Sequence, residues 1–89
     1  MPERRVTIIN KLGLHARAAA KLVATASRFP ASIRVEKDSH AVNAKSIMGI
    51  MMLAAGKGSD LVLRADGEGA DEALSALEEL IANRFGEDE

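Results

Sequence analysis

The residues best suited to chemistry lie in the segment Gly13-Leu14-His15-Ala16-Arg17, at the start of an alanine-rich run. The first backbone N–H groups of a helix lack acceptors inside the helix, and with the positive end of the helix dipole they bind anions. Here those are the N–H groups of Ala16 and Arg17, and the guanidinium of Arg17 fits phosphate oxygens. A ring nitrogen of His15 beside them predicts a residue that accepts and passes on a phosphoryl group. On these residues alone, a histidine that merely caps the helix or lies on the surface remains an alternative.

Hydrophobic periodicity predicts the elements that position this segment. Helical spacing favours helices over residues 16–27, 47–53 and 70–84, and β-branched or alternating stretches favour strands over 6–9, 32–37, 40–43 and 60–65. Pro30 ends the first helix near Arg28. The order βαββαβα predicts one α+β domain over residues 1–89, an open-faced β-sandwich with a four-stranded antiparallel sheet and three helices on one face.

Composition restricts the function classes. The chain has no cysteine and only two well-separated histidines, so we expect neither a disulfide nor a metal site, and no cofactor. No stretch has the length of a membrane span and residues 1–5 lack an apolar signal region, which predicts a cytoplasmic protein that does not insert into membranes. Without Trp or Tyr, and without a sustained basic stripe, nucleic-acid binding is not expected.

The net charge of −1 conceals an asymmetry along the chain. Residues 1–58 carry a balance of +7, and residues 59–89 carry a balance of −8. One interpretation is simply a solvated acidic C-terminal helix and tail. The other is a positive face around His15 that favours phosphate and acidic partner surfaces.

The helix that begins after Ser46 is apolar almost all round. Ser46 is a suitable N-cap, and a two-turn helix on a sheet buries only one face. We therefore expect Ile50 and Leu53, with one methionine, to fill the core. The remaining side chains predict an exposed patch for docking partners, formed by Ile47, Met48 and Met51. His40, near a turn, is expected to be exposed and is given no role.

Two stretches resemble the signatures of the HPr family, the histidine phosphocarriers of the bacterial phosphoenolpyruvate:sugar phosphotransferase system. Residues 13–17 resemble its active-site signature, and residues 42–51 resemble the signature around a regulatory serine. The resemblance implies that Nδ1 of His15 accepts a phosphoryl group from enzyme I and hands it to a IIA domain or protein. It also implies a monomeric, stoichiometric carrier rather than an enzyme, and makes Ser46 a target for an HPr kinase/phosphorylase.

The sequence leaves three features of the chain to be settled by other observations. Ala18 stands where many family members have proline, and because proline is tolerated in the first helical turn, we expect the change to leave the site intact. Residues 84–89 resemble the ending of NPr, the nitrogen-branch paralogue, so the sequence leaves open whether the chain serves the sugar or the nitrogen branch. A binding module controlled at Ser46 without phosphoryl transfer is a further alternative.

Overall fold

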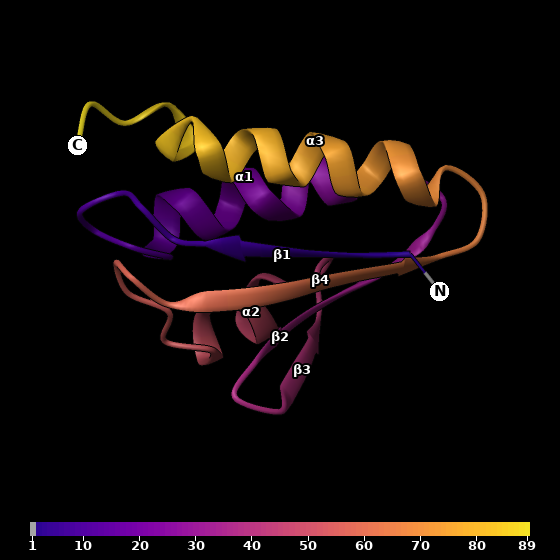
Figure 1. Ribbon diagram of the computed structural model, residues 1–89, viewed down its shortest axis with the longest axis horizontal. Coiled ribbons are helices and arrows are strands. Elements are labelled where there is room, and N and C mark those ends of the chain that lie inside the picture. The colour runs from indigo at the N-terminus through magenta and orange to yellow at the C-terminus, as the bar shows by residue number, and fades with distance from the viewer. Residues whose placement is uncertain (1) are drawn as a thin grey trace.

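The computed structural model describes residues 2–89 and has the predicted element order (Figure 1). The strands are β1 (Glu3–Thr7), β2 (Ser32–Lys37), β3 (His40–Asn43) and β4 (Asp60–Asp66). The helices are α1 (Ala16–Ala26), α2 (Ile47–Met52) and α3 (Ala70–Ala82), followed by a short 3-10 turn, Arg84–Gly86. The strands form one antiparallel sheet in the order β1-β4-β2-β3.

One face of the sheet packs against the helices and the other faces solvent. Leu61 and Leu63 of β4 are buried and alternate with more exposed residues, as the two-residue period of a strand requires. Arg64 points to the open face, where it pairs with Glu3 of β1 and Glu36 of β2. This division fits an antiparallel sheet with a solvated face and an apolar face.

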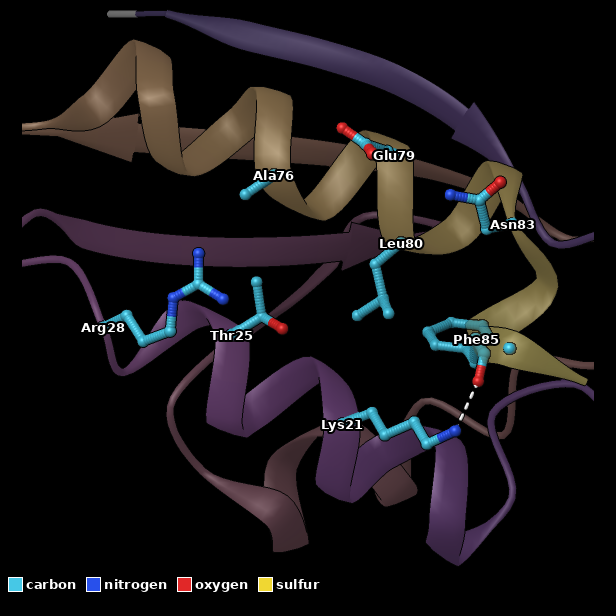
Figure 2. Close-up of a pocket in the computed structure, with 9 residues that line it drawn as sticks. Lys21, Thr25, Arg28, Ala76, Glu79, Leu80, Asn83 and Phe85 are labelled. Atoms are coloured by element: carbon cyan, nitrogen blue, oxygen red, sulfur yellow. Dashed lines mark hydrogen bonds between the residues drawn. The ribbon is translucent and has the colours of Figure 1, made fainter.

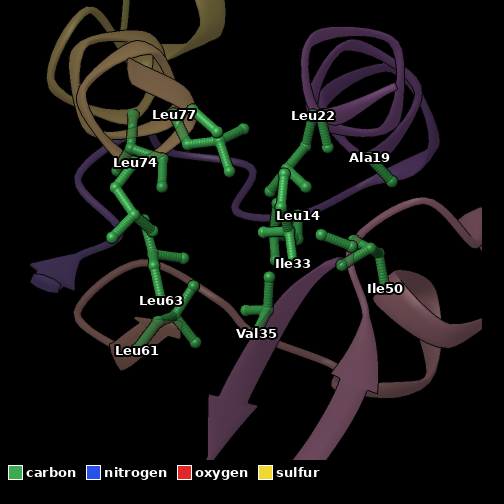
Figure 3. Packing of buried hydrophobic residues seen from close by; sticks show 14 of the residues in the cluster. Leu14, Ala19, Leu22, Ile33, Val35, Ile50, Leu61, Leu63, Leu74 and Leu77 are labelled. Carbon is green, nitrogen blue, oxygen red and sulfur yellow. The ribbon is translucent and has the colours of Figure 1, made fainter. Parts of the chain in front are cut away.

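The core lies between that apolar face and the three helices (Figure 3). Leu22 of α1, Ile50 of α2 and Leu77 of α3 are all completely buried. They belong to the same buried cluster as Ile33 and Val35 of β2, so each helix contributes at least one large aliphatic residue to the core. Close packing of this kind fixes the end of α1 that carries His15.

Two predicted elements have bounds that are wrong by two or more residues. β1 spans Glu3–Thr7 rather than residues 6–9. The strand is held by backbone hydrogen bonds to β4, which do not depend on side-chain type, so charged residues are tolerated on this edge strand. One of them, Arg4, pairs with Glu78 at 3.7 Å. α3 ends at Ala82 rather than residue 84. Arg84, Phe85 and Gly86 all have positive φ, so the chain leaves the helix in a left-handed turn.

Candidate functional site

His15 is the N-cap residue of α1. Its backbone is extended (φ −70°, ψ 174°), and its carbonyl accepts a hydrogen bond from Ala19 N–H at 2.8 Å, the first of the helix. The N–H groups of Ala16, Arg17 and Ala18 consequently have no acceptor within the helix. The backbone donors predicted to hold phosphate thus follow directly after His15 in the chain.

The loop before His15 is fixed against the segment that follows α2. Gly13 has φ +66°, and a Cβ there would lie 2.6 Å from the carbonyl oxygen of Ala55, so the approach requires glycine. Leu14 is buried, and its N–H donates to the same carbonyl at 2.8 Å. The position of His15 is therefore set by packing as well as by the helix start.

The C-terminal tail contacts the His15 ring, which the sequence did not predict. Nε2 of His15 hydrogen-bonds to Oε2 of Glu87, while Oε1 of Glu87 accepts a hydrogen bond from Nδ2 of Asn10 at 2.9 Å. Asn10 is completely buried, and its Nδ2 also donates to the carbonyl of Gly13 at 2.9 Å. The side chain of His15 is consequently only 29% exposed, and part of the acidic tail is an element of the site rather than a solvated end.

The tail is anchored on both sides of Glu87. Phe85 is completely buried, and its carbonyl accepts a hydrogen bond from Lys21 Nζ at 2.6 Å (Figure 2). At the other end, Lys11 N–H donates to the main-chain oxygen of Glu89 at 2.9 Å, and the two side chains pair at 3.4 Å. Figure 1 shows the C-terminus at the same end of the molecule as the β1–α1 loop.

Arg17 remains available to an incoming anion. It is exposed, forms no ion pair with a carboxylate in the part of the chain that the structure describes, and lines the same surface hollow as His15, Leu12 and Glu87. Its guanidinium can therefore approach a phosphoryl group held at the helix start.

The neighbours of Glu87 also change its protonation. Hydrogen bonds from His15 and Asn10 lower the pKa of the Glu87 carboxyl below its usual value of 4.5. Since the pKa is lower in the folded chain than in the unfolded chain, the contact stabilises the fold above the unfolded pKa and is lost as the pH falls through the folded pKa. An NMR titration of the Glu87 side-chain carboxyl should show a midpoint below 4.5, and a midpoint at or above it would contradict the contact.

Ser46 and the apolar patch lie on α2. Ser46 is the N-cap, and its Oγ accepts a hydrogen bond from Gly49 N–H at 3.2 Å. Ile50 and Leu53 are buried as predicted, but the expectation that one methionine also fills the core is wrong. The exposed fractions of the large apolar residues here are 40% for Ile47, 69% for Met48, 44% for Met51 and 73% for Met52.

Two further residues clarify the extent of the site. Leu12 is 65% exposed beside His15, and sequence reasoning missed it because a single leucine in a loop shows no periodicity. His40 is the first residue of β3 and is exposed. Within residues 2–89, no three His, Cys, Asp or Glu side chains are grouped as metal ligands would be, and none of the helices has the length and hydrophobicity of a membrane span.

Comparison with known proteins assigns the family. A family model described as the PTS HPr component phosphorylation site matches residues 2–83. The chain is 60% identical to the phosphocarrier protein HPr of Pseudomonas aeruginosa, with all of both chains covered. HPr-C-His from Thermoanaerobacter tengcongensis superposes with a TM-score of 0.97 at 52% identity over all of both chains. A structure described as an HPr dimer from the same organism gives 0.79 at 53% identity, covering 98% of this chain and all of the other.

These comparisons place the chain among phosphoryl carriers rather than among enzymes with turnover. The chain belongs to the HPr family, the phosphocarrier proteins of the phosphoenolpyruvate-dependent phosphotransferase system. The predicted monomer stays a prediction, since a dimeric structure of a relative exists.

Proposed function

We propose that Nδ1 of His15 is the atom that accepts the phosphoryl group from enzyme I and releases it to a IIA domain or protein. The observation that carries this proposal is the position of the ring: His15 caps α1, its Nε2 contacts Glu87, and no side chain of residues 2–89 hydrogen-bonds to Nδ1. The N–H groups of Ala16 and Arg17 and the Arg17 guanidinium are the groups that would hold the phosphoryl oxygens.

The transfer needs no base. The Nδ1 lone pair forms a bond to phosphorus while the bond from phosphorus to its donor atom on enzyme I breaks, and that electron pair stays with the donor. The proton on Nε2 does not move, and the ring gains positive charge as the N–P bond forms. Arg17 and the helix start offset the charge on the phosphoryl oxygens of the loose transition state. Transfer to IIA runs the same step in reverse.

The exposed apolar side chains support a docking role. Ile47, Met48 and Met51 on α2, together with Leu12 beside His15, form the partner-docking patch that we propose for both enzyme I and IIA. Flexible thioethers adapt to different surfaces, which suits a carrier that meets a donor and an acceptor in turn. We further propose that the chain acts in the cytoplasm, where phosphoenolpyruvate is available.

A labelling experiment tests the acceptor role. The chain is incubated with enzyme I and phosphoenolpyruvate labelled in its phosphate, and a IIA protein is then added. We expect stoichiometric label that is lost in acid, as phosphohistidine is, and that moves to IIA. Acid-stable label, or no label at all, would contradict the proposal.

Phosphorylation of Ser46 by an HPr kinase/phosphorylase would act on docking rather than on folding. A phosphate adds about −1.5 to −2 charges at the N-terminus of α2, where the helix dipole accommodates it, but it lies beside Ile47. Ser46→Asp should therefore slow transfer from enzyme I by raising KM. Ser46→Ala is the matched control: it should lose about 1 kcal/mol of stability with the cap, yet transfer normally. Unchanged kinetics in Ser46→Asp would disprove this regulation.

The labelling result also separates the remaining alternatives. A regulatory module without phosphoryl transfer would bind its partner under control of Ser46 and would not respond to changes at His15. A nitrogen-branch member would donate to a nitrogen-type IIA protein in preference to a sugar-type one. Where many family members have proline, Ala18 provides a backbone N–H at the helix start, and we expect it to leave phosphoryl acceptance by His15 intact.

A further inference from the structure

The contact between Glu87 and His15 determines which ring nitrogen of His15 carries the proton. An ionised carboxylate only accepts hydrogen bonds, so the nitrogen that faces it, Nε2, must carry the ring proton. A neutral imidazole has one N–H, and Nδ1 is then left with a free lone pair. The nitrogen that faces away from the tail is consequently the nucleophilic one.

The carboxylate is itself held in place by Asn10. The amide nitrogen of Asn10 faces two acceptors, Oε1 of Glu87 and the carbonyl of Gly13, both at 2.9 Å. The reversed amide would place an oxygen against those two oxygens, so this orientation is the one the surroundings allow. Because Asn10 is completely buried, it gives Glu87 a rigid support.

We propose that Glu87 is a positioning residue for phosphoryl transfer: held by Asn10, its carboxylate keeps the proton of His15 on Nε2 and stabilises the positive charge that the ring gains when Nδ1 bonds to phosphorus. This inference rests on the proposed function of His15. A charge-assisted hydrogen bond to the ring is weaker in the ground state, where the ring is neutral, than in the transition state, where it is charged. The contact therefore acts on the rate of the chemical step rather than on partner binding.

Glu87→Gln tests this with little change in shape. In glutamine, one of the two carboxylate oxygens is replaced by an NH₂ group, so only one of the two positions facing His15 and Asn10 can accept a hydrogen bond. If the NH₂ group faces His15, it donates to Nε2, and the ring proton moves to Nδ1. We expect the rate of phosphoryl acceptance at saturating enzyme I to fall about ten- to a hundredfold, the range of a charge-assisted hydrogen bond, while KM for enzyme I changes little.

Asp88→Asn is the matched control. It removes one negative charge from the adjacent position of the same tail, and in the structure of residues 2–89 the Asp88 side chain makes no ion pair or hydrogen bond. Its rate and KM should match those of the wild-type chain. Thermal unfolding of both variants checks that the fold is kept.

The ring proton gives a readout that is independent of transfer. In ¹⁵N NMR spectra at alkaline pH, the wild-type His15 ring should show a protonated Nε2 and an unprotonated Nδ1, and Glu87→Gln should shift this population toward Nδ1–H. Ring nitrogen signals that are the same in the wild-type chain and Glu87→Gln would overturn the proposal. If the wild-type chain accepts no label from enzyme I, the proposed function of His15 fails, whereas the ring signals still show whether Glu87 sets the tautomer.

Discussion

Replacing His15 with alanine is expected to abolish phosphoryl acceptance from enzyme I while leaving the fold intact. The substitution removes the nitrogen that we propose forms the bond to phosphorus, and no other group at the helix start can replace it. The helix should persist because the His15 side chain makes no capping hydrogen bond and is partly exposed. The measurement is the amount of acid-labile label per chain after incubation with enzyme I and labelled phosphoenolpyruvate.

His40→Ala is the control for that experiment. It makes the same chemical change at the chain's other histidine, which is exposed at the start of β3. We expect it to take up label as the wild-type chain does. Label that persists in His15→Ala, or that disappears in His40→Ala, would show that the acceptor has been assigned to the wrong residue.

Replacing Phe85 with alanine should give the largest loss of stability. Phe85 is completely buried in the core, and removing a buried aromatic side chain costs about 3–5 kcal/mol through lost burial and the cavity left behind. Phe85 also anchors the tail: its carbonyl binds Lys21, and Glu87 follows two residues later. The free energy of unfolding in urea measures the loss.

Phe29→Ala is the matched control for Phe85. Phe29 is only partly buried, although it packs against the core, so its removal should cost less than the removal of Phe85. Equal losses for the two variants would show that Phe85 is not the anchor described. A further consequence is that Phe85→Ala should weaken the contact between Glu87 and His15, visible as a change in the His15 ring signals.

Much of the site could be predicted because its signals are local. Gly13 ends the preceding extended segment, and the alanine-rich run that follows forms a helix. Together they place His15 and Arg17 at the helix N-terminus. Ser46 was predicted as an N-cap on the same grounds. The element order followed from periodicity because each helix and strand overlaps a stretch with an apolar or β-branched pattern, although the charged start of β1 lies outside its stretch.

The tail could not be predicted because its contacts are distant in sequence. Glu87 lies 72 residues from His15 and 77 from Asn10, and nothing in a short acidic run shows whether it is solvated or folded back. The deciding feature is the left-handed turn around Phe85, formed by two residues other than glycine at positive φ. Such a turn is stabilised by tertiary packing rather than by local propensity.

The exposure of the methionines also depended on packing. A short helix that is apolar on all sides predicts that some of its side chains face outward. How many of them can pack into the core depends on the space that the neighbouring elements leave. In the structure, Ile50 and Leu53 fill the space, so Met48, Met51 and Met52 stay on the surface. The exposed apolar surface of α2 is therefore broader than predicted, because it includes Met52.

The chemical identity of the phosphorylated atom most directly tests whether His15 is the phosphoryl acceptor. The chain, labelled with ¹⁵N in its histidines, is phosphorylated by enzyme I and phosphoenolpyruvate and observed by ³¹P and ¹⁵N NMR. We expect a single phosphorus bonded to Nδ1 of His15, with the proton retained on Nε2. Phosphorus bonded to Nε2, to His40, or to a hydroxyl oxygen would contradict it.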